Sequence, residues 1–425
     1  MHPNALLDLT TALLRAVLKL DSPADGVVSS FFRQHRELGP RERHSLAETA
    51  YAVLRQRPVL QYLARSEGDT VKGGGLERRL ALLGWQGDEG FLQAAMQPHE
   101  KLWLARLRAV DRATLPEKLR HNLPDWLAGA LQTQLGDDFW PLVTALDHAA
   151  PLDLRVNTMK MKRDEAEQAL AEAGIAAAPT PFSPWGLRVQ GKPALQRMDI
   201  FTSGAVEVQD EGSQLLALLT DAKRGEMVVD FCAGAGGKTL ALGAAMRSTG
   251  RLYAFDVSGH RLEALKPRMA RSGLSNVHPA QIAHERDERI KRLAGKIDRV
   301  LIDAPCSGLG TLRRNPDLKW RQSPTSVAEL QAKQGAILAS ASRLLKPGGR
   351  LVYATCSLLR AENEDVVTAF EATHGREFEP LPAQTALEAA RVERAAELVA
   401  GPFLRLWPHR QQTDGFFAAV WQRRG

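Results

Sequence analysis

Two cysteines in the second half of the chain follow apolar runs of the same kind. The run Arg299–Ile302 leads into Asp303-Ala-Pro-Cys306, and the run Arg350–Tyr353 leads into Ala354-Thr-Cys356. Both runs stop at small residues or proline, which is typical of buried parallel strands that enter a loop. Ligands of open α/β sheets lie just beyond the carboxyl ends of the strands. We therefore predict that Cys306 and Cys356 face one site and act on one substrate.

Two thiols beside a carboxylate are the groups needed to make carbon-5 of cytosine reactive. That carbon is not nucleophilic until a nucleophile adds at carbon-6, and a thiolate is suited to add there and to leave again. The reaction also needs an acid at N3 of the ring and a base that removes the carbon-5 proton. Cys306, Cys356 and Asp303 form such a set. A lone cysteine is more often a small buried hydrophobic residue, which is our interpretation of the Cys232 thiol.

A glycine-rich turn follows the first strand of this half of the chain. The strand is Val228–Phe231, and the turn opens the helix Lys238–Met246. Glycines let the backbone approach a ligand closely, and an acid about twenty residues further on holds ribose hydroxyls. Asp256 has that position. The residues predicted to bind the cofactor are Cys232, Ala233, Gly234, Ala235, Gly236, Gly237, Lys238, Asp256 and Asp303.

Three cofactors compete for this turn. A P-loop for ATP or GTP requires glycine where Cys232 stands, although Gly-Gly-Lys-Thr matches the end of that motif. A dinucleotide fingerprint requires glycine or alanine where Thr239 stands, which disfavours NAD. S-adenosylmethionine carries no phosphate, so a looser turn suffices, with Asp256 at the ribose and Asp303 near the reacting end. We therefore predict S-adenosylmethionine; a tight turn that holds no ligand is the remaining alternative.

Strands and helices alternate regularly from Val228 onward. Further strands are expected at Arg251–Phe255, at Val277–Ile282 and at the two cysteine runs, with a long helix over about 327–345 and two closing strands near 403–408 and 415–421. Connections of this length imply a doubly wound, Rossmann-like α/β sheet with right-handed crossovers. Pro267 lies inside the helix after Ser258, where it predicts a kink or a late helix start.

The first third of the chain has a different pattern. Apolar residues recur at three- and four-residue spacing from Asn4 to about Leu146, as in an all-α domain, with Gly73–Gly75 as a loop. Pro151–Asn157 begins a strand-helix-strand pattern that ends before Asp210, where polar residues cap a new helix. We predict an all-α RNA-binding domain at 1–148, a small α+β module at 149–209 and the Rossmann-like methyltransferase domain at 210–425.

Composition limits the partners and the compartment. The net charge of +7 and the pI near 9.4 favour a polyanionic partner such as RNA. A solvated helix face or a contact with an RNA backbone explains equally well the arginines and histidines of the helical first third: Arg33, His35, Arg36, Arg41, Arg43, His44, Arg55 and Arg57. Three cysteines without a CxxC pair indicate free thiols and no metal. Without an apolar span or export signal, we expect a cytoplasmic protein that does not contact a membrane.

Five motifs form a series along the chain: Asp230–Lys238, Asp303–Gly310, Arg314–Trp320, Ala354–Ser357 and Glu362–Glu364. The series resembles that of the RsmB/Nop-Sun family of RNA 5-methylcytosine methyltransferases, most of all its bacterial ribosomal-RNA members, and covers Pro151 to the C-terminus. The resemblance implies that Cys356 is the nucleophile at carbon-6 and that Cys306 assists proton removal and product release. It also implies that Asp303 contacts the cytosine, with Lys238 beside it. More loosely, Leu38–Arg43 and Tyr51–Arg55 resemble the NusB-like RNA-binding domain of those members.

Three further segments carry expectations. The family has an aspartate on the adenine side of the cofactor where this chain has His284, so we expect the adjacent Glu285 to replace it. Glu362–Glu364 is expected to cap the next helix, with ordering of the Cys356 loop as a second possibility. Basic residues interleaved with an aromatic can grip phosphates and stack a base, or form a solvated loop. Such a group follows the catalytic loop: Arg313, Arg314, Lys319, Trp320 and Arg321.

These features predict an enzyme that methylates carbon-5 of a cytidine in RNA, with ribosomal RNA as the expected substrate. The methyl donor is S-adenosylmethionine, and Cys356 forms a covalent adduct with carbon-6. We expect a monomer. Two alternatives stay open: an RNA-binding or ribosome assembly factor without catalysis, and a nucleotide-binding ATPase or dehydrogenase. Intact Cys306 and Cys356 disfavour the first, while Cys232 and Thr239 disfavour the second.

Overall fold

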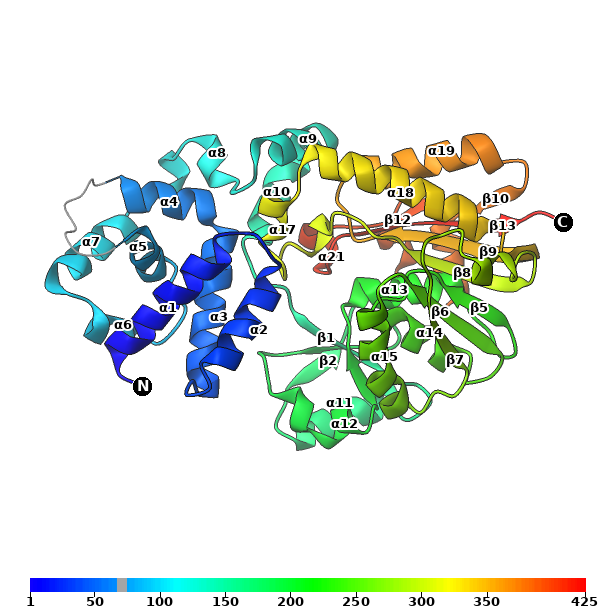
Figure 1. Ribbon diagram of the computed structural model, residues 1–425, viewed down its shortest axis with the longest axis horizontal. Helices are drawn as coiled ribbons and strands as arrows, with labels where there is room; N and C mark the ends of the chain where they lie inside the picture. Colours follow the sequence, from blue (N-terminus) through cyan, green and yellow to red (C-terminus); the bar gives the residue numbers. More distant parts are fainter. Residues whose placement is uncertain (67–74) are drawn as a thin grey trace. The chain divides into compact units, whose positions relative to one another are not determined.

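The computed structural model describes residues 1–66 and 75–425, so Gly73 and Gly74 of the expected loop lie outside the described residues. The chain divides into two compact units (Figure 1). Met1–Ala149 and the short segment Thr311–Ser323 form the first, and Ala150–Gly310 with Pro324–Gly425 form the second. The boundaries at residues 148 and 209 stay predictions. The sequence pattern assigned Thr311–Ser323 to the methyltransferase domain, whereas the structure includes it in the first unit.

Amphipathic helices build the first unit around one core. Its helices are α1 (Pro3–Val17), α2 (Ala24–Gln34), α3 (Pro40–Arg55), α4 (Arg57–Arg65), α5 (Leu76–Leu83), α6 (Glu89–Ala95), α7 (Pro98–Arg108), α8 (Glu117–Arg120), α9 (Asp125–Leu135), α10 (Phe139–Leu146) and, in the 311–323 segment, α17 (Leu318–Arg321). Leu13, Leu46 and Val53 are fully buried, as their helical spacing predicts. A proline stands in the first turn of α1, α3 and α7. Backbone N–H groups at this position have no partner within the helix, so proline costs no helical hydrogen bond there.

The 311–323 segment is held by backbone groups at helix ends. Lys319 Nζ donates to the carbonyl oxygen of Arg55 at 2.7 Å, and Trp320 Nε1 donates to that of Leu54 at 2.8 Å. The last carbonyls of a helix have no intrahelical partner, so these two side chains complete the end of α3. At the start of α2, Asp317 Oδ2 accepts from the backbone N–H of Ala24 at 3.1 Å.

This arrangement contradicts the predicted RNA contact for two residues of the segment. Lys319 is 3% exposed and Arg313 is 6% exposed, so neither side chain is available to a phosphate. Arg55 is also buried and donates to the carbonyl oxygen of Arg313 at 3.0 Å. Arg33 and His44 are exposed, and for them RNA contact stays a prediction.

Replacing Lys319 with methionine is expected to change how stability depends on pH. Burial lowers the pKa of Lys319 from 10.5 to about 7, although the charge of Asp147 opposes the shift. Between these values the unfolded chain binds more protons than the folded chain, so the free energy of unfolding rises with pH. The Lys319→Met chain lacks this pH-dependent contribution. As the pH rises above 7, the free energy of unfolding of the natural chain should therefore increase relative to that of the variant, by on the order of a few kcal/mol up to the ordinary lysine pKa.

Urea denaturation at several pH values from about 7 to 9 measures this difference. Lys101→Met, which replaces an exposed lysine of α7, is the matched control. If both variants show the same pH slope as the natural chain, Lys319 is not the buried base described here.

In the second unit, a small antiparallel sheet has its own core. Its order is β2-β3-β1-β4, from β1 (Leu152–Val156), β2 (Ala177–Pro179), β3 (Gly186–Val189) and β4 (Val206–Val208). The helices α11 (Arg163–Glu172) and α12 (Asp199–Thr202) belong to the same part of the chain. Leu154, Leu170 and Val206 share the core. The expected strand, helix and two short strands are present, and β4 is an additional strand that the sequence pattern did not predict.

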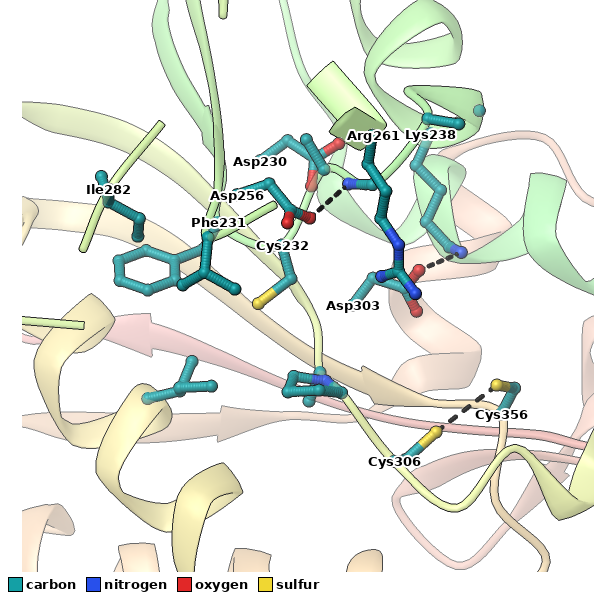
Figure 2. Close-up of a pocket in the computed structure, with 18 of the residues that line it drawn as sticks. Asp230, Phe231, Cys232, Lys238, Asp256, Arg261, Ile282, Asp303, Cys306 and Cys356 are labelled. Atoms are coloured by element: carbon teal, nitrogen blue, oxygen red, sulfur yellow. Dashed lines mark hydrogen bonds and ion pairs between the residues drawn. The ribbon is translucent and has the colours of Figure 1, made fainter. Parts of the chain in front are cut away.

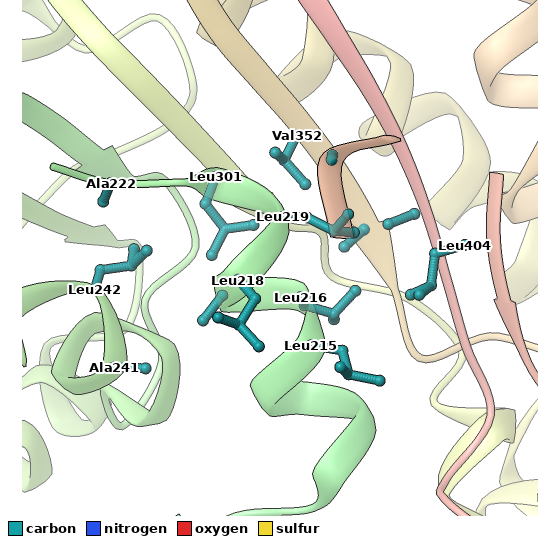
Figure 3. Packing of buried hydrophobic residues seen from close by; sticks show 14 of the residues in the cluster. Leu215, Leu216, Leu218, Leu219, Ala222, Ala241, Leu242, Leu301, Val352 and Leu404 are labelled. Atoms are coloured by element: carbon teal, nitrogen blue, oxygen red, sulfur yellow. The ribbon is translucent and has the colours of Figure 1, made fainter. Parts of the chain in front are cut away.

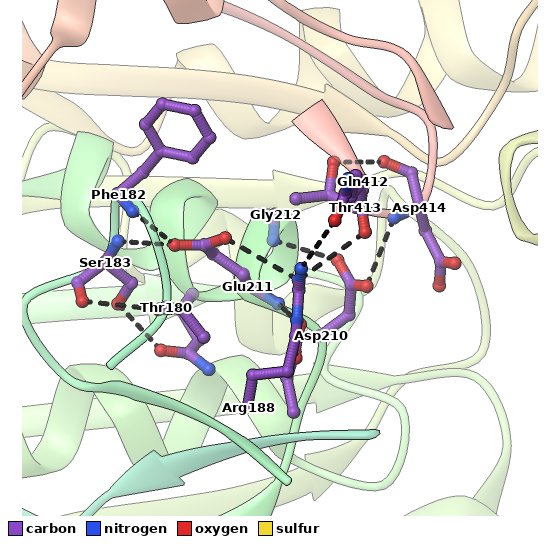
Figure 4. A network of polar contacts seen from close by, with 12 residues as sticks. Thr180, Phe182, Ser183, Arg188, Asp210, Glu211, Gly212, Gln412, Thr413 and Asp414 are labelled. Carbon is purple, nitrogen blue, oxygen red and sulfur yellow. Dashed lines mark hydrogen bonds and ion pairs between the residues drawn. The ribbon is translucent and has the colours of Figure 1, made fainter. Parts of the chain in front are cut away.

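A polar network joins this sheet to α13 (Glu211–Thr220), as Figure 4 shows. The Glu211 carboxylate accepts from the backbone N–H groups of Phe182 at 2.6 Å and Ser183 at 2.7 Å. Asp210 caps α13 by accepting from Gly212 N at 2.8 Å. Its second oxygen accepts from Asp414 N at 3.1 Å. The network therefore holds the start of α13 to two loops, one at Phe182 and Ser183 and the other at Asp414.

The large sheet is doubly wound, which confirms the predicted fold class. Its order is β11-β12-β13-β9-β8-β5-β6-β7, with β10 also paired to β13. The five strands from β9 to β7 in this order pair in parallel, and β13 is antiparallel to β9. The strands are β5 (Met227–Asp230), β6 (Arg251–Asp256), β7 (Val277–Gln281), β8 (Ile297–Asp303), β9 (Leu345–Thr355), β10 (Phe378–Leu381), β11 (Val399–Ala400), β12 (Phe403–Leu406) and β13 (Phe416–Arg423).

Helices cover both faces of this sheet (Figure 1). One face carries α13, α14 (Gly237–Ala245), α15 (Gly259–Ser272) and α20 (Ala383–Ala389), and the other carries α18 (Pro324–Ser342) and α19 (Glu364–His374). Because side chains alternate along a strand, Val352 belongs to the first core and Leu351 to the second. Figure 3 shows the leucines of α13 against Leu301 and Val352. The short helices α16 (Glu288–Lys291) and α21 (Pro408–Gln411) complete the unit.

Two element boundaries bear on the predictions. The helix α15 begins at Gly259, directly after its N-cap Ser258, so the late start does not occur and a kink at Pro267 stays a prediction. The cap supplies an acceptor to Arg261 N, and the proline ring is on the exposed side of the helix. The strand β9 begins at Leu345, five residues before the expected start at Arg350. Within the described ranges, no helix has the length and apolar character needed to span a membrane.

Candidate active site

A cavity of about 610 Å³ lies at the carboxyl ends of β5, β6 and β8 (Figure 2). This volume is within the range of roughly 300–1,000 Å³ that is usual for small-molecule sites. The sheet places it at the edge where α/β folds bind their ligands. Of the residues predicted to form the site, all except Gly236 line this cavity.

The structure brings the two predicted catalytic thiols together. The sulfur atoms of Cys306 and Cys356 are 3.4 Å apart. Their loops follow β8 and β9, which pair in parallel with Asp303 opposite Ala354, so both loops begin at the same edge. Gly310 N donates to the carbonyl oxygen of Cys356 at 2.8 Å. A Cβ at Gly310 would lie 2.0 Å from the Gly415 carbonyl oxygen, so this approach requires glycine.

Asp303 and Lys238 form an ion pair in the cavity, with Lys238 Nζ 2.7 Å from Asp303 Oδ2. Desolvation lowers the pKa of Lys238, but the charge of Asp303 and its hydrogen bond raise it above the ordinary value. Lys238 is therefore a cation at neutral pH. Its Nζ also lies 5.8 Å from the centre of the Phe416 ring, within the range of a cation–π contact.

The two thiols have different electrostatic surroundings. The hydrogen bond with Cys356, burial, and the charges of Cys356 and Glu362 raise the pKa of Cys306 well above its ordinary value. The charge of Cys356, in turn, is among the causes that raise the pKa of Lys238. A thiolate at Cys356 therefore has a cation nearby, whereas a thiolate at Cys306 has a carboxylate nearby.

Cys232 lies in the wall of the cavity away from this pair. Burial raises the pKa of its thiol well above the ordinary value, and the charges of Asp230, Asp303 and Asp256 add to the effect. A thiol in such surroundings stays protonated and inert. The side chain is partly buried against the core, which fits the interpretation of Cys232 as a small apolar residue beside the glycine turn.

The turn between β5 and α14 has the shape that its glycines predict. Gly236 has φ +85°, and a Cβ there would lie 2.0 Å from a methyl carbon of Leu265. The Asp256 carboxylate accepts from the backbone N–H of Gly234 at 2.8 Å and of Ser258 at 2.7 Å. Each of its oxygens keeps a further lone pair, so Asp256 can shape the turn and still accept from a hydroxyl in the cavity.

Asp230 is a cavity residue to which the sequence pattern gave no role. Thr239 Oγ1 donates to its Oδ2 at 2.6 Å, while Oδ1 has no hydrogen-bond partner within the described part of the chain. Burial raises the pKa of Asp230 to about 7. A buried polar atom without a partner, in the wall of a cavity, is available to a donor on a bound ligand.

His284 and Glu285 both line the cavity, near Val257 and Ile282. The Glu285 carboxylate is 3.6 Å from Arg286 Nε, and its backbone carbonyl accepts from the Ser340 hydroxyl at 2.5 Å. Replacement of the family's aspartate by Glu285 stays a prediction.

Other cavity residues come from segments without any recognisable motif. Gln209 lies between β4 and α13, Ser213 lies in the first turn of α13, and Gln209 Nε2 donates to the Ser213 hydroxyl at 3.1 Å. Arg268 of α15 donates to the carbonyl oxygen of Ala235 in the glycine turn at 2.6 Å and pairs with Glu207 at 3.0 Å. No local sequence signal marks these residues, because only the packing of β4 and α15 beside the turn brings them to the cavity.

Two family models match the chain. The model described as 16S rRNA methyltransferase RsmB/F matches residues 217–422, and the ferredoxin-like domain of the RsmF/B-like methyltransferases matches residues 123–196. A solved structure named PH0851 is similar with a TM-score of 0.77 and 25% identity, covering 99% of both chains.

Curated relatives extend the similarity to nearly the whole chain. The probable ribosomal RNA small subunit methyltransferase B of Synechocystis is 32% identical, covering 97% of this chain and 98% of the relative. The Bacillus subtilis protein of the same description is 30% identical, covering 80% of this chain and 75% of the relative. With the glycine turn and both cysteine loops inside the matched region, this chain belongs to the RsmB/F family of 16S rRNA methyltransferases.

Proposed function

We propose that this protein transfers a methyl group from S-adenosylmethionine to carbon-5 of a cytidine in ribosomal RNA, with Cys356 as the nucleophile. The observation that carries the proposal is the pair of sulfur atoms 3.4 Å apart in a cavity that also holds the Lys238–Asp303 ion pair. Relatives described as ribosomal RNA methyltransferases support the choice of RNA. The proposed compartment is the cytoplasm, and the proposed form is a monomer that needs no metal.

The residues around the glycine turn fit S-adenosylmethionine. Asp256 has lone pairs for the ribose hydroxyls, and the unpartnered Oδ1 of Asp230 is an acceptor for the methionine ammonium. Gly234, with φ +55°, has nothing within 4 Å of a built Cβ, so the backbone borders open space there. When bound, S-adenosylmethionine supplies an electrophilic methyl group on a sulfonium.

The proposed chemistry begins at Cys356. Its sulfur forms a bond to carbon-6 of cytosine, which makes carbon-5 an enamine carbon able to take the methyl group. Asp303, at the end of β8, carries a negative charge that holds the protonated N3 while the ring accepts electron density.

The remaining steps restore the aromatic ring. The carbon-5 proton passes to a base, and the electron pair of that bond expels the Cys356 sulfur from carbon-6. Cys306 is placed beside Cys356, where it can assist both the proton transfer and the release of the product. The target base must leave its stack to reach this cavity, as in other enzymes that modify bases.

A methyl-transfer assay tests the proposal directly. Small-subunit ribosomal RNA that lacks the modification is incubated with the protein and isotope-labelled S-adenosylmethionine, and the digested nucleosides are analysed by mass spectrometry. We expect label in 5-methylcytidine, and its loss when Cys356 is changed to alanine. RNA binding without any labelled nucleoside would favour an assembly factor, and label at another atom would exclude the adduct at carbon-6.

A further inference from the structure

A single buried carboxylate connects the two cysteine loops. Glu362 ends the short 3₁₀ turn after the Cys356 loop, and its side chain is fully buried. Its Oε1 accepts from Ser307 N at 2.8 Å and from Gln334 Nε2 at 3.0 Å. Its Oε2 accepts from the Ser307 hydroxyl at 2.5 Å and from the Ser357 hydroxyl. All four donors are uncharged, so hydrogen bonds alone compensate for the buried charge.

The two serines that bind Glu362 are the sequence neighbours of the two cysteines. Ser307 directly follows Cys306, and Ser357 directly follows Cys356. Glu362 therefore holds the residue next to each sulfur-bearing residue, and the two hydroxyl oxygens are 3.2 Å apart. Gln334 of α18 also donates to the carbonyl oxygen of Pro305 at 3.0 Å, so the Cys306 loop is held on both sides of the cysteine.

Neighbouring groups fix Glu362 itself. Tyr353 of β9 donates its hydroxyl to the Glu362 carbonyl oxygen at 2.6 Å. Asn363 accepts from the Thr355 hydroxyl and donates to the Ser357 carbonyl oxygen at 3.0 Å. The expected helix-capping role is therefore secondary: Glu362 precedes α19 and directs its carboxylate to the two loops instead.

From this geometry we infer that Glu362 is a positioning residue, which holds the Cys306 and Cys356 sulfur atoms at their working separation without touching the substrate. The inference rests on the proposed function for its catalytic consequence, but the separation of the sulfur atoms is measurable independently of catalysis. Both oxygens of Glu362 are needed, because each of them accepts from two donors.

The Glu362→Gln variant tests the inference. An amide of the same size keeps only one acceptor oxygen. Its NH₂ group either meets the N–H donors of Ser307 and Gln334 or forces both serine hydroxyls to accept, so the set of four bonds to a carboxylate is lost in either orientation. We expect kcat for methyl transfer to fall about 10²-fold, since a displacement of about 1 Å between reacting groups has effects of that size. The KM for RNA and the affinity for S-adenosylhomocysteine should change less than about twofold, because Glu362 does not line the cavity.

A second readout reports the sulfur separation directly. Diamide takes two hydrogens and two electrons from a pair of nearby thiols and joins them as a disulfide. We expect Cys306 and Cys356 of the natural chain to be joined readily, and those of Glu362→Gln at least about tenfold more slowly, as followed by mass spectrometry of the peptides. Asp365→Asn, which affects an exposed pair with Arg360 in the next helix, is the matched control and should behave as the natural chain.

Two milder variants test the same inference if Glu362→Gln does not fold. Ser307→Ala and Ser357→Ala each remove one hydroxyl donor, and both should show smaller losses of the same kind, with a lower thermal unfolding temperature because a buried acceptor loses one partner. Equal rates of disulfide formation in Glu362→Gln and the natural chain would overturn the inference. If the natural chain transfers no methyl group but Glu362→Gln still slows disulfide formation, the proposed function fails while the positioning role stands.

Discussion

The Cys306→Ala variant is expected to accumulate a covalent complex with RNA that survives denaturation. Cys356 keeps its sulfur and its neighbouring cation Lys238, so addition to carbon-6 and methyl transfer can proceed. Without the second thiol, 3.4 Å away in the natural chain, proton removal and release of the product are impaired. The adduct should appear as a slowly migrating band in a denaturing gel with labelled RNA, in amounts at least about tenfold above the natural chain.

Two further variants separate the roles of the cysteines. The Cys306→Ala/Cys356→Ala chain should form no adduct, because the nucleophile is gone. Cys232→Ala should form no more adduct than the natural chain, since the pKa of the Cys232 thiol is raised well above its ordinary value and the thiol stays protonated. An adduct that survives in the double variant would mean that the nucleophile is another residue.

Asp303→Asn is expected to lower the rate of methyl transfer by about 10²–10⁴-fold, the range usual for loss of an acid or base in the transition state. The amide lacks the negative charge that would hold a protonated N3, and it leaves the Lys238 cation without its partner at 2.7 Å. Single-turnover measurements with saturating RNA separate this loss from weaker binding.

Asp298→Asn is the matched control for this change. Asp298 lies near the start of the same strand, β8, where it pairs with Lys346 and accepts from Met227 N at 2.9 Å. Its loss should lower stability without changing the single-turnover rate by more than about twofold. If Asp303→Asn retains the natural rate, the cytosine is activated by a different group, and the assignment of the acid is wrong.

Local patterns in the sequence were sufficient for the doubly wound fold and for the sheet edge at which the cavity lies. Strand ends, glycine turns and helix caps are short-range signals, because they depend on the conformations that a few neighbouring residues can adopt. The parallel pairing of β8 with β9 then follows from the fold, and with it the meeting of Cys306 and Cys356. The Asp256 position relative to the glycine turn follows for the same reason.

Contacts between distant segments decided the rest. Lys319 was predicted to contact RNA because it lies in a segment rich in basic and aromatic residues. Its Nζ instead donates to the backbone carbonyl oxygen of Arg55, 264 residues away in the chain. The carboxylate of Glu362 acts on Ser307, 55 residues earlier, and Gln209 reaches the cavity only through the packing of β4 beside the turn. The sequence alone determined which backbone conformations form and where strands end. Only the tertiary structure decided which polar side chains are buried and which partners they meet, because desolvation and hydrogen bonding depend on the complete three-dimensional surroundings.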